Sequence, residues 1–362
     1  MTSRRVLMTT DAVGGVWTYS LELARGLCAS GVEVMLTVIG PPPDDAQRAE
    51  AVDIPGLVLV VPGLQLEWQD RAGPLGTAPR QRLAGLARMF EPDIVHCNGY
   101  REAAAGFEAP VVLAAHSCVR SWWWACRAED VPPEWSAYAD GVRAGLAAAG
   151  AVVAPSAAFL ADLTYAWGHV PRSRVIHNGL DVPSGIASRR PVVLAAGRLW
   201  DEAKNVDLLA REAPRLPWPV RLAGKAPPDA PGWRGVEWLG ALPRERLLAT
   251  MREAAIFAAP ARYEPFGLAI LEAAASGCAL VLGRLPTLVE VWGDAACYVP
   301  PGDGGALRSA LHGLMADPAA LARAQGAARE RAATYSRRRM VGEYVGLYAE
   351  LLERGHRQGC AA

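Results

Sequence analysis

Two glutamates with a fixed spacing are the first candidates for chemistry in this sequence. Glu264 and Glu272 lie in the stretch RYEPFGLAILEAAASG, residues 262–277, with seven residues between them. A glutamate inside an apolar helix is rarely buried without a partner. Glu272 is therefore expected to pair with a core arginine, to face solvent, or to point into a pocket. In a pocket, both carboxylates could accept hydrogen bonds from sugar hydroxyls.

Backbone N–H groups follow Glu264 directly. A helix is predicted to begin near Phe266 or Gly267, and Gly277 is predicted to close it. The amides of Phe266, Gly267 and Leu268 would then lie at the positive end of the helix, where a phosphate is stabilised. The alternative is that Glu264 only caps this helix.

Two basic residues form a second candidate group. In LAAGRLWDEAKN, residues 194–205, a strand delivers Gly197 and Arg198 to the carboxyl edge of a sheet, and Lys204 comes at the next helix start. A planar guanidinium and a mobile ammonium together suit a diphosphate. The chain has two lysines, Lys204 and Lys225, among 37 basic residues, which weakly favours a specific use of the ammonium. The alternative is two solvated surface charges.

The third candidate group lies in the first half of the chain. In TTDAVGGVWT, Gly14 and Gly15 stand between a predicted strand and a predicted helix. Paired glycines there let backbone N–H groups approach an anion, although a plain tight turn uses them equally well. The pattern is not GxGxxG, so it gives a nicotinamide cofactor no support. His116 ends the predicted strand PVVLAAH, whereas His96 in DIVHCNG is predicted to be structural.

Composition excludes several classes of protein. Lysine plus arginine and aspartate plus glutamate both number 37, which argues against a nucleic-acid binder. The seven cysteines are an odd number without a CxxC pair, so reduced thiols are expected, with no disulfide framework or zinc site. Asp44 and Asp45 lie in a proline-rich stretch and are interpreted as turn residues, so no metal site is predicted. No signal peptide or membrane span is predicted, and we expect a soluble, cytoplasmic protein that can still lie against a membrane.

The order of elements predicts an α/β fold with two domains, because short β-branched runs alternate with helical periodicity. Strands are expected at 4–10, 32–40, 57–61, 93–98, 110–116, 151–156 and 174–178, and again at 191–198, 220–225, 236–240, 254–260 and 279–283. A helix follows the first strand and buries Trp17, Leu21, Ala24 and Leu27 on one face. The expected parts are a first domain over 1–180, a linker over 181–190 rich in Pro, Gly and Ser, a second domain over 191–335 and a terminal helical segment over 336–362.

These features together resemble one family. E-P-F-G-L-x-x-L-E is similar to the E-x7-E signature of the retaining nucleotide-sugar glycosyltransferases of family 4. The glycine-rich loop, G-R-L followed by K-N, VIHNGLDV and LPTLVEVWGDAACYVPPGD match the family in order over nearly the whole chain. The resemblance implies a GT-B fold, in which two Rossmann-like, doubly wound domains face a cleft and the terminal helix crosses back to the first domain.

The resemblance also implies roles for donor-binding residues. Arg198 and Lys204 would neutralise the diphosphate of the donor. Glu272 would accept hydrogen bonds from the ribose, so that its partner is the ligand. Glu264 and the amides of Phe266, Gly267 and Leu268 would hold the transferred sugar.

On the side of the first domain, the resemblance implies that Gly14 and Gly15 meet the donor. His116 would approach the donor sugar, which makes His116, Glu264, Arg198 and Lys204 the catalytic candidates. The family often has an aspartate after this histidine, and here Ser117 takes its place.

The implied reaction moves a sugar from a UDP- or GDP-sugar to an acceptor hydroxyl with retention of anomeric configuration. The donor is a substrate, so no cofactor is expected, and fixed positive groups replace a metal in stabilising the departing diphosphate. The alternatives are an epimerase or hydrolase of the same fold and a non-catalytic sugar-nucleotide-binding protein.

The acceptor is not identified by the sequence, and a sugar, a lipid-linked acceptor and a small molecule all stay open. After His116 come Trp122, Trp123, Trp124 and Trp135. Their indoles could stack on an acceptor, rest at a lipid headgroup layer, or simply pack on the domain.

Overall fold

The computed structural model describes residues 4–70, 73–170, 172–182, 189–226 and 233–359. The chain forms two compact units. The first contains the chain up to Trp124, Glu129–Gly179 and the chain from Arg337 onward, whereas the second contains Ala125–Ala128 and Leu180–Ser336. Of the expected linker over 181–190, residues 183–188 lie outside the described residues.

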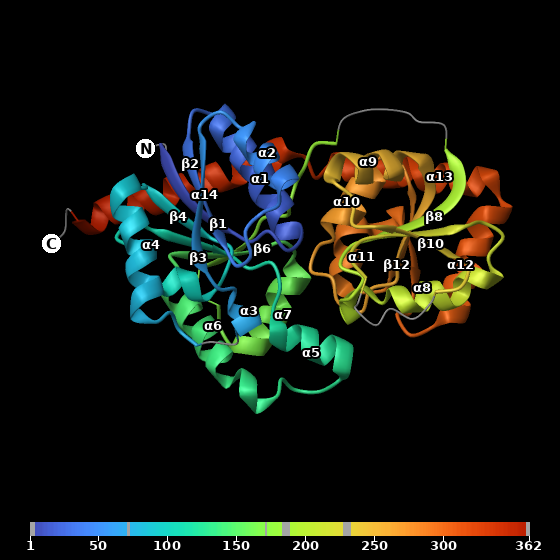
Figure 1. The fold of residues 1–362 in the computed structure, drawn as a ribbon, viewed down its shortest axis with the longest axis horizontal. Helices are drawn as coiled ribbons and strands as arrows, with labels where there is room; N and C mark the ends of the chain where they lie inside the picture. The colour runs from blue at the N-terminus through green and yellow to red at the C-terminus, as the bar shows by residue number, and fades with distance from the viewer. Residues whose placement is uncertain (1–3, 71–72, 171, 183–188, 227–232, 360–362) are drawn as a thin grey trace. The chain divides into compact units, whose positions relative to one another are not determined.

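The first unit is built on a seven-stranded sheet with the order β3-β2-β1-β4-β5-β6-β7, and every neighbouring pair is parallel (Figure 1). Its strands are β1 (Arg5–Thr10), β2 (Glu33–Ile39), β3 (Leu57–Leu64), β4 (Ile94–Cys97), β5 (Val111–Ala114), β6 (Ala151–Ala154) and β7 (Ser173–Val175). The central strands are apolar on both faces because helices cover both sides of a parallel sheet.

The helix that follows β1 in the first unit buries Trp17, Leu21, Ala24 and Leu27, as predicted. This helix is α1, and the helices of the unit are α1 (Gly15–Ala29), α2 (Asp45–Val52), α3 (Glu67–Asp70), α4 (Thr77–Phe90), η1 (Arg101–Ala104), α5 (Val119–Arg127), η2 (Pro133–Trp135), α6 (Ser136–Ala148), α7 (Ala157–Trp167) and α14 (Arg337–Gly359). Asp44 accepts a hydrogen bond from the Gln47 amide and Gln47 returns one, so Asp44 caps α2. The interpretation of Asp44 and Asp45 as turn residues was therefore wrong.

The last helix, α14, completes the first unit by packing on α1. The hydroxyl of Tyr348 lies 2.7 Å from Nδ1 of His96, and the hydroxyl of Tyr19 lies 3.2 Å from Nε2 of the same ring. Arg337 also donates a 2.6 Å hydrogen bond to the buried carboxylate of Glu22 on α1. Burial lowers the pKa of His96 to about 3, so this ring is neutral and structural, as predicted.

The second unit repeats the design with a six-stranded parallel sheet in the order β10-β9-β8-β11-β12-β13. Its strands are β8 (Arg190–Ala196), β9 (Val220–Ala223), β10 (Val236–Gly240), β11 (Ala254–Ala259), β12 (Ala279–Gly283) and β13 (Cys297–Val299). Its helices are η3 (Glu202–Lys204), α8 (Val206–Glu212), η4 (Ala213–Arg215), α9 (Arg244–Glu253), α10 (Leu268–Ala275), α11 (Pro286–Trp292), η5 (Gly293–Ala295), α12 (Gly304–Ala316) and α13 (Pro318–Ala333).

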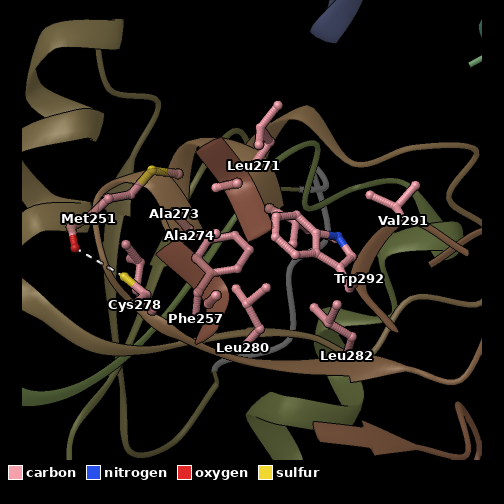
Figure 2. Close-up of a cluster of buried hydrophobic side chains, with 14 of the residues drawn as sticks. Met251, Phe257, Leu271, Ala273, Ala274, Cys278, Leu280, Leu282, Val291 and Trp292 are labelled. Carbon is pink, nitrogen blue, oxygen red and sulfur yellow. Dashed lines mark hydrogen bonds between the residues drawn. The ribbon is translucent and has the colours of Figure 1, made fainter. Parts of the chain in front are cut away.

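One face of this second sheet carries a core of aliphatic and aromatic side chains (Figure 2). Leu271 of α10, Leu280 of β12 and Trp292 of α11 are each at most 1% exposed. The thiol of Cys278 donates to the carbonyl of Met251 at 3.1 Å, which ties α9 to the turn before β12. The core therefore fixes α10, the helix that carries Glu272, against the sheet.

Both sheets reverse their strand order at one point. In the first, β2 and β3 lie on one side of β1, whereas β4 and the later strands lie on the other. In the second, β8 and β11 form the same kind of switch point. Ligands of doubly wound folds bind outside the carboxyl ends of the strands at these points. Among the described residues, no helix is both long and apolar enough to cross a membrane.

Replacing each of two glycines of the first unit by alanine tests how closely its helices pack. A Cβ atom on Gly145 of α6 would lie 1.9 Å from the Tyr100 carbonyl oxygen, whereas one on Gly346 of α14 would meet nothing within 4 Å. We expect Gly145→Ala to lower the free energy of unfolding by about 1–3 kcal/mol or more through overpacking. Gly346→Ala is expected to raise it by about 0.5–1 kcal/mol through helix propensity.

Equilibrium urea unfolding followed by circular dichroism measures both effects, because the two glycines belong to the same unit. Equal stability of the two alanine variants would contradict the close backbone contact between α6 and η1.

Candidate active site

The switch point of the second unit brings together most of the predicted donor-binding residues. Strands β8 and β11 are neighbours, ending at Ala196 and Ala259. The loop after β8 carries Arg198 and leads to Lys204 at the end of η3, and the loop after β11 carries Glu264. Since parallel strands end at the same edge, two loops far apart in sequence meet there.

Lys204 and Glu264 form an ion pair at this edge. Nζ of Lys204 lies 2.5 Å from Oε2 of Glu264, and the two side chains are 24% and 15% exposed. The backbone carbonyl of Glu264 accepts a 2.6 Å hydrogen bond from the Thr287 hydroxyl, which fixes the loop on its other side. Both side chains are thus mostly buried but still partly exposed to solvent. The ammonium group also has further N–H donors that a ligand could accept from.

Arg198 is oriented by its own loop. Its Nη2 donates to Oδ2 of Asp201 at 2.8 Å, while its side chain stays 38% exposed. The guanidinium also lies over the ring of Trp200, with 5.5 Å from Cζ to the ring centroid. Its Nε is buried, with no hydrogen-bond partner among the described residues. Sequence reasoning missed both Asp201 and Trp200, although they stand within three residues of Arg198.

Two backbone features hold the loop after β8 close to its neighbours. Gly224, at the end of β9, approaches so closely that a Cβ atom on it would lie 1.9 Å from the Gly197 carbonyl oxygen. Asn205 adopts a left-handed conformation, and its Nδ2 donates to the carbonyls of Pro260 and Pro301 at 2.8 Å and 2.6 Å. Asn205 thus links the Lys204 loop to the Glu264 loop, a function that no local sequence signal indicated.

Glu272 has a protein partner that sequence reasoning did not identify. The side chain is only 5% exposed, and its Oε1 accepts a 3.0 Å hydrogen bond from Nε of Arg244 on α9. A buried carboxylate needs a cation, and the alternative of pairing with an arginine is the one observed. The expectation that the ligand is the partner of Glu272 is therefore incomplete, because Arg244 already holds one oxygen.

The start of α10 supplies the predicted backbone groups. The helix begins at Leu268, and Gly267 precedes it in a left-handed conformation with φ of 89°. A Cβ atom there would lie 2.7 Å from Ile270. Phe266 is buried and its ring packs edge-on against Tyr335 at 5.7 Å, so its side chain is not available to a ligand.

The remaining predicted site residues lie in the first unit. Gly14 precedes α1 and Gly15 is its first residue, and the structure gives this helix no side-chain cap. His116 comes two residues after the end of β5, and its Nε2 lies 2.8 Å from Oδ1 of Asn98. The ring of Tyr19 stands edge-on to His116 at 4.4 Å. Burial lowers the pKa of His116 to about 4, so its imidazole is neutral at pH 7.

Three of the four tryptophans after His116 lie on one helix, and Trp135 lies in the short helix η2. Trp122, Trp123 and Trp124 belong to α5 and are half-buried. Trp124 stands edge-on to Tyr165 at 5.0 Å, and the guanidinium of Arg120 lies over Trp124 at 4.9 Å. These contacts show that at least part of the aromatic group packs on the first unit.

Comparisons with known proteins identify the family of this chain. The family model described as Glycosyltransferase Family 4 matches residues 13–183, and that described as Glycosyl transferases group 1 matches residues 190–317. A D-inositol 3-phosphate glycosyltransferase of Xylanimonas cellulosilytica is 28% identical, over 95% of this chain and 94% of that enzyme.

Solved structures share the fold at lower identity. A sucrose-phosphate synthase from Thermosynechococcus elongatus is 20% identical, with a TM-score of 0.78 over 97% of this chain and all of that chain. The Anabaena protein HepE, solved in complex with UDP and glucose, is 18% identical, with a TM-score of 0.72 over 96% of this chain and 99% of that chain.

Two Rossmann-like units with parallel sheets, the first of them completed by the last helix, define the class of GT-B glycosyltransferases. Within this class, the chain belongs to glycosyltransferase family 4, as its two matching family models and its relatives show. The resemblance recognised from the motifs is thereby confirmed.

The contact between Arg244 and Glu272 leads to a prediction for stability. We expect Arg244→Ala to lower the free energy of unfolding by about 1–3 kcal/mol, because it leaves a buried carboxylate without this cation. The expected loss of stability is smaller than for a fully buried ion pair, because Arg244 is partly exposed. Chemical denaturation measures the effect.

Arg246→Ala is the matched control, since Arg246 lies on the same helix and is exposed. It is expected to change stability by no more than about 0.5 kcal/mol. Losses of equal size in the two variants would show that Glu272 does not depend on Arg244.

Proposed function

We propose that this glycosyltransferase moves a sugar from a nucleoside-diphosphate sugar, with UDP or GDP as the nucleotide, to an acceptor hydroxyl. The reaction retains anomeric configuration and needs no metal ion. The observation that carries the proposal is the Lys204–Glu264 ion pair beside Arg198, at the switch point of the second sheet. The complex of the similar Anabaena protein with UDP and glucose supports this class of donor.

The roles follow from the charge that develops during transfer. When the bond between the anomeric carbon and the phosphate oxygen breaks, its electron pair stays on the diphosphate. Arg198 and Lys204, already oriented by Asp201 and Glu264, stabilise this charge with little reorganisation. They supply the positive charge that a metal ion would otherwise bring.

The acceptor oxygen attacks the anomeric carbon on the face from which the diphosphate departs, and its proton passes to the leaving phosphate oxygen. The new bond therefore keeps the configuration of the old one. Glu264 and the backbone amides at 266–268 hold the sugar, and Glu272, oriented by Arg244, accepts from the ribose. Gly14, Gly15 and His116 of the first unit meet the donor in this proposal.

A panel of UDP-, GDP- and ADP-sugars, incubated with and without fractionated cell extract, tests the function. We expect release of a nucleoside diphosphate only when an acceptor is present, with undiminished release in EDTA. Nuclear magnetic resonance of the product should show the anomeric configuration of the donor. Release without an acceptor, with inversion of the sugar, would indicate an epimerase instead, and binding without release would indicate a non-catalytic protein.

Lys204 is the residue with the largest expected effect on catalysis. Lys204→Ala should slow transfer by roughly 10²–10³-fold, because one preorganised charge donor to the leaving diphosphate is lost. Steady-state kinetics with the donor identified from the panel measures the change.

Arg211→Ala, at an exposed position of α8, is the control and should leave kcat and KM unchanged. If Lys204→Ala behaves like this control, the role assigned to Lys204 is wrong.

A further inference from the structure

Asn98 is a residue that neither the motifs nor the family resemblance singled out, and it joins three elements of the first unit. It follows β4, and its backbone N–H donates to the hydroxyl of Thr9 at 2.9 Å. Its Nδ2 donates to the Thr9 carbonyl at 2.7 Å and to the Ser20 hydroxyl at 3.1 Å. Its Oδ1 lies 2.8 Å from Nε2 of His116.

The orientation of the Asn98 amide follows from the chemistry of its partners. The backbone carbonyl of Thr9 can only accept a hydrogen bond, so the amide group facing it must be the NH₂. Turning the amide over would place two carbonyl oxygens against each other at 2.7 Å. The oxygen of Asn98 therefore faces His116.

This orientation determines which nitrogen of His116 carries the proton. Because Oδ1 of Asn98 can only accept, Nε2 of His116 must donate. The ring is neutral, since burial lowers its pKa to about 4, and it has only one N–H. Nδ1 is then unprotonated, and no described residue donates a hydrogen bond to it.

Two titratable neighbours of His116, Tyr19 and His96, are uncharged and therefore do not oppose this state. The ring of Tyr19 on α1 packs edge-on against His116 at 4.4 Å. His96 of β4, the nearest titratable imidazole, is held neutral by burial, with a pKa lowered to about 3. The hydroxyl of Tyr19 stays protonated, because burial raises its pKa well above the ordinary value.

We propose that Asn98 is a positioning residue that holds His116 as the Nε2–H tautomer, so that the ring presents Nδ1 as a hydrogen-bond acceptor. Such an acceptor selects a group that donates, which is a sugar hydroxyl, and not a phosphate oxygen or a carboxylate. The catalytic consequence rests on the proposed function, whereas the tautomer itself does not.

Nuclear magnetic resonance of the full chain labelled with 15N-histidine tests the tautomer directly. Long-range correlations from the ring protons show which nitrogen is protonated, and the His116→Gln variant identifies the His116 signals among the six histidines. At pH 7 we expect a protonated Nε2 and an unprotonated Nδ1. A proton on Nδ1, or averaging between both tautomers, would overturn the inference even if the enzyme transfers sugar.

Two variants test the role of Asn98 in catalysis. Asn98→Asp places a carboxylate beside Nε2, which should raise the pKa of His116 by about 1–3 and add a new step to the pH profile of kcat/KM. At a pH about one unit below this raised pKa, kcat/KM should fall about tenfold, because only about a tenth of the oriented acceptor then remains a neutral imidazole. An unchanged pH profile in a folded variant would contradict the positioning role.

Ser20→Ala is the matched control, because it removes one partner of Nδ2 and leaves both the Thr9 carbonyl and Oδ1 in place. It should keep the tautomer and the pH profile of the parent protein. If Asn98→Asp does not fold, the tautomer measured on the parent chain decides the inference alone. The signals of His96 should stay constant in Ser20→Ala and serve as the internal reference.

Discussion

An ion pair with 2.5 Å between the Lys204 ammonium and the Glu264 carboxylate joins the segments that follow two neighbouring strands of the second unit. Lys204 and Glu264 are far apart in the chain and meet only because β8 and β11 are adjacent and parallel. The close approach of Gly224 and the two hydrogen bonds of Asn205 hold the loops that carry them. In the proposed reaction, the carboxylate keeps the ammonium in place until the diphosphate arrives.

Much of the fold was predictable because buried parallel strands appear in sequence as short continuous apolar runs. The run at 279–283 coincides with β12, all of whose residues are buried. The order of strands was not predictable from such runs, since it depends on pairing between segments distant in sequence. Strand β13, Cys297–Val299, was not predicted.

The residues of the candidate site were also predictable only in part. Arg198 could be singled out because a glycine and a charge follow directly on an apolar strand, and Glu264 because of its spacing from Glu272. Arg244 and Asn98 could not, because each acts through a residue that lies elsewhere in the chain. The general rule that a buried carboxylate needs a cation predicted an arginine as one alternative for Glu272, but it did not say which of 35 arginines.

The return of α14 to the first unit has a consequence for how the protein matures. Tyr348 reaches His96 across 252 residues of chain, so the first unit lacks part of its interior until α14 has been synthesised. The second unit, built almost entirely from Leu180–Ser336, has all of its strands before the last helix leaves the ribosome. The unit that is synthesised later therefore has all of its strands first, whereas the first unit gains Tyr344 and Tyr348, two of its fully buried side chains, only with α14.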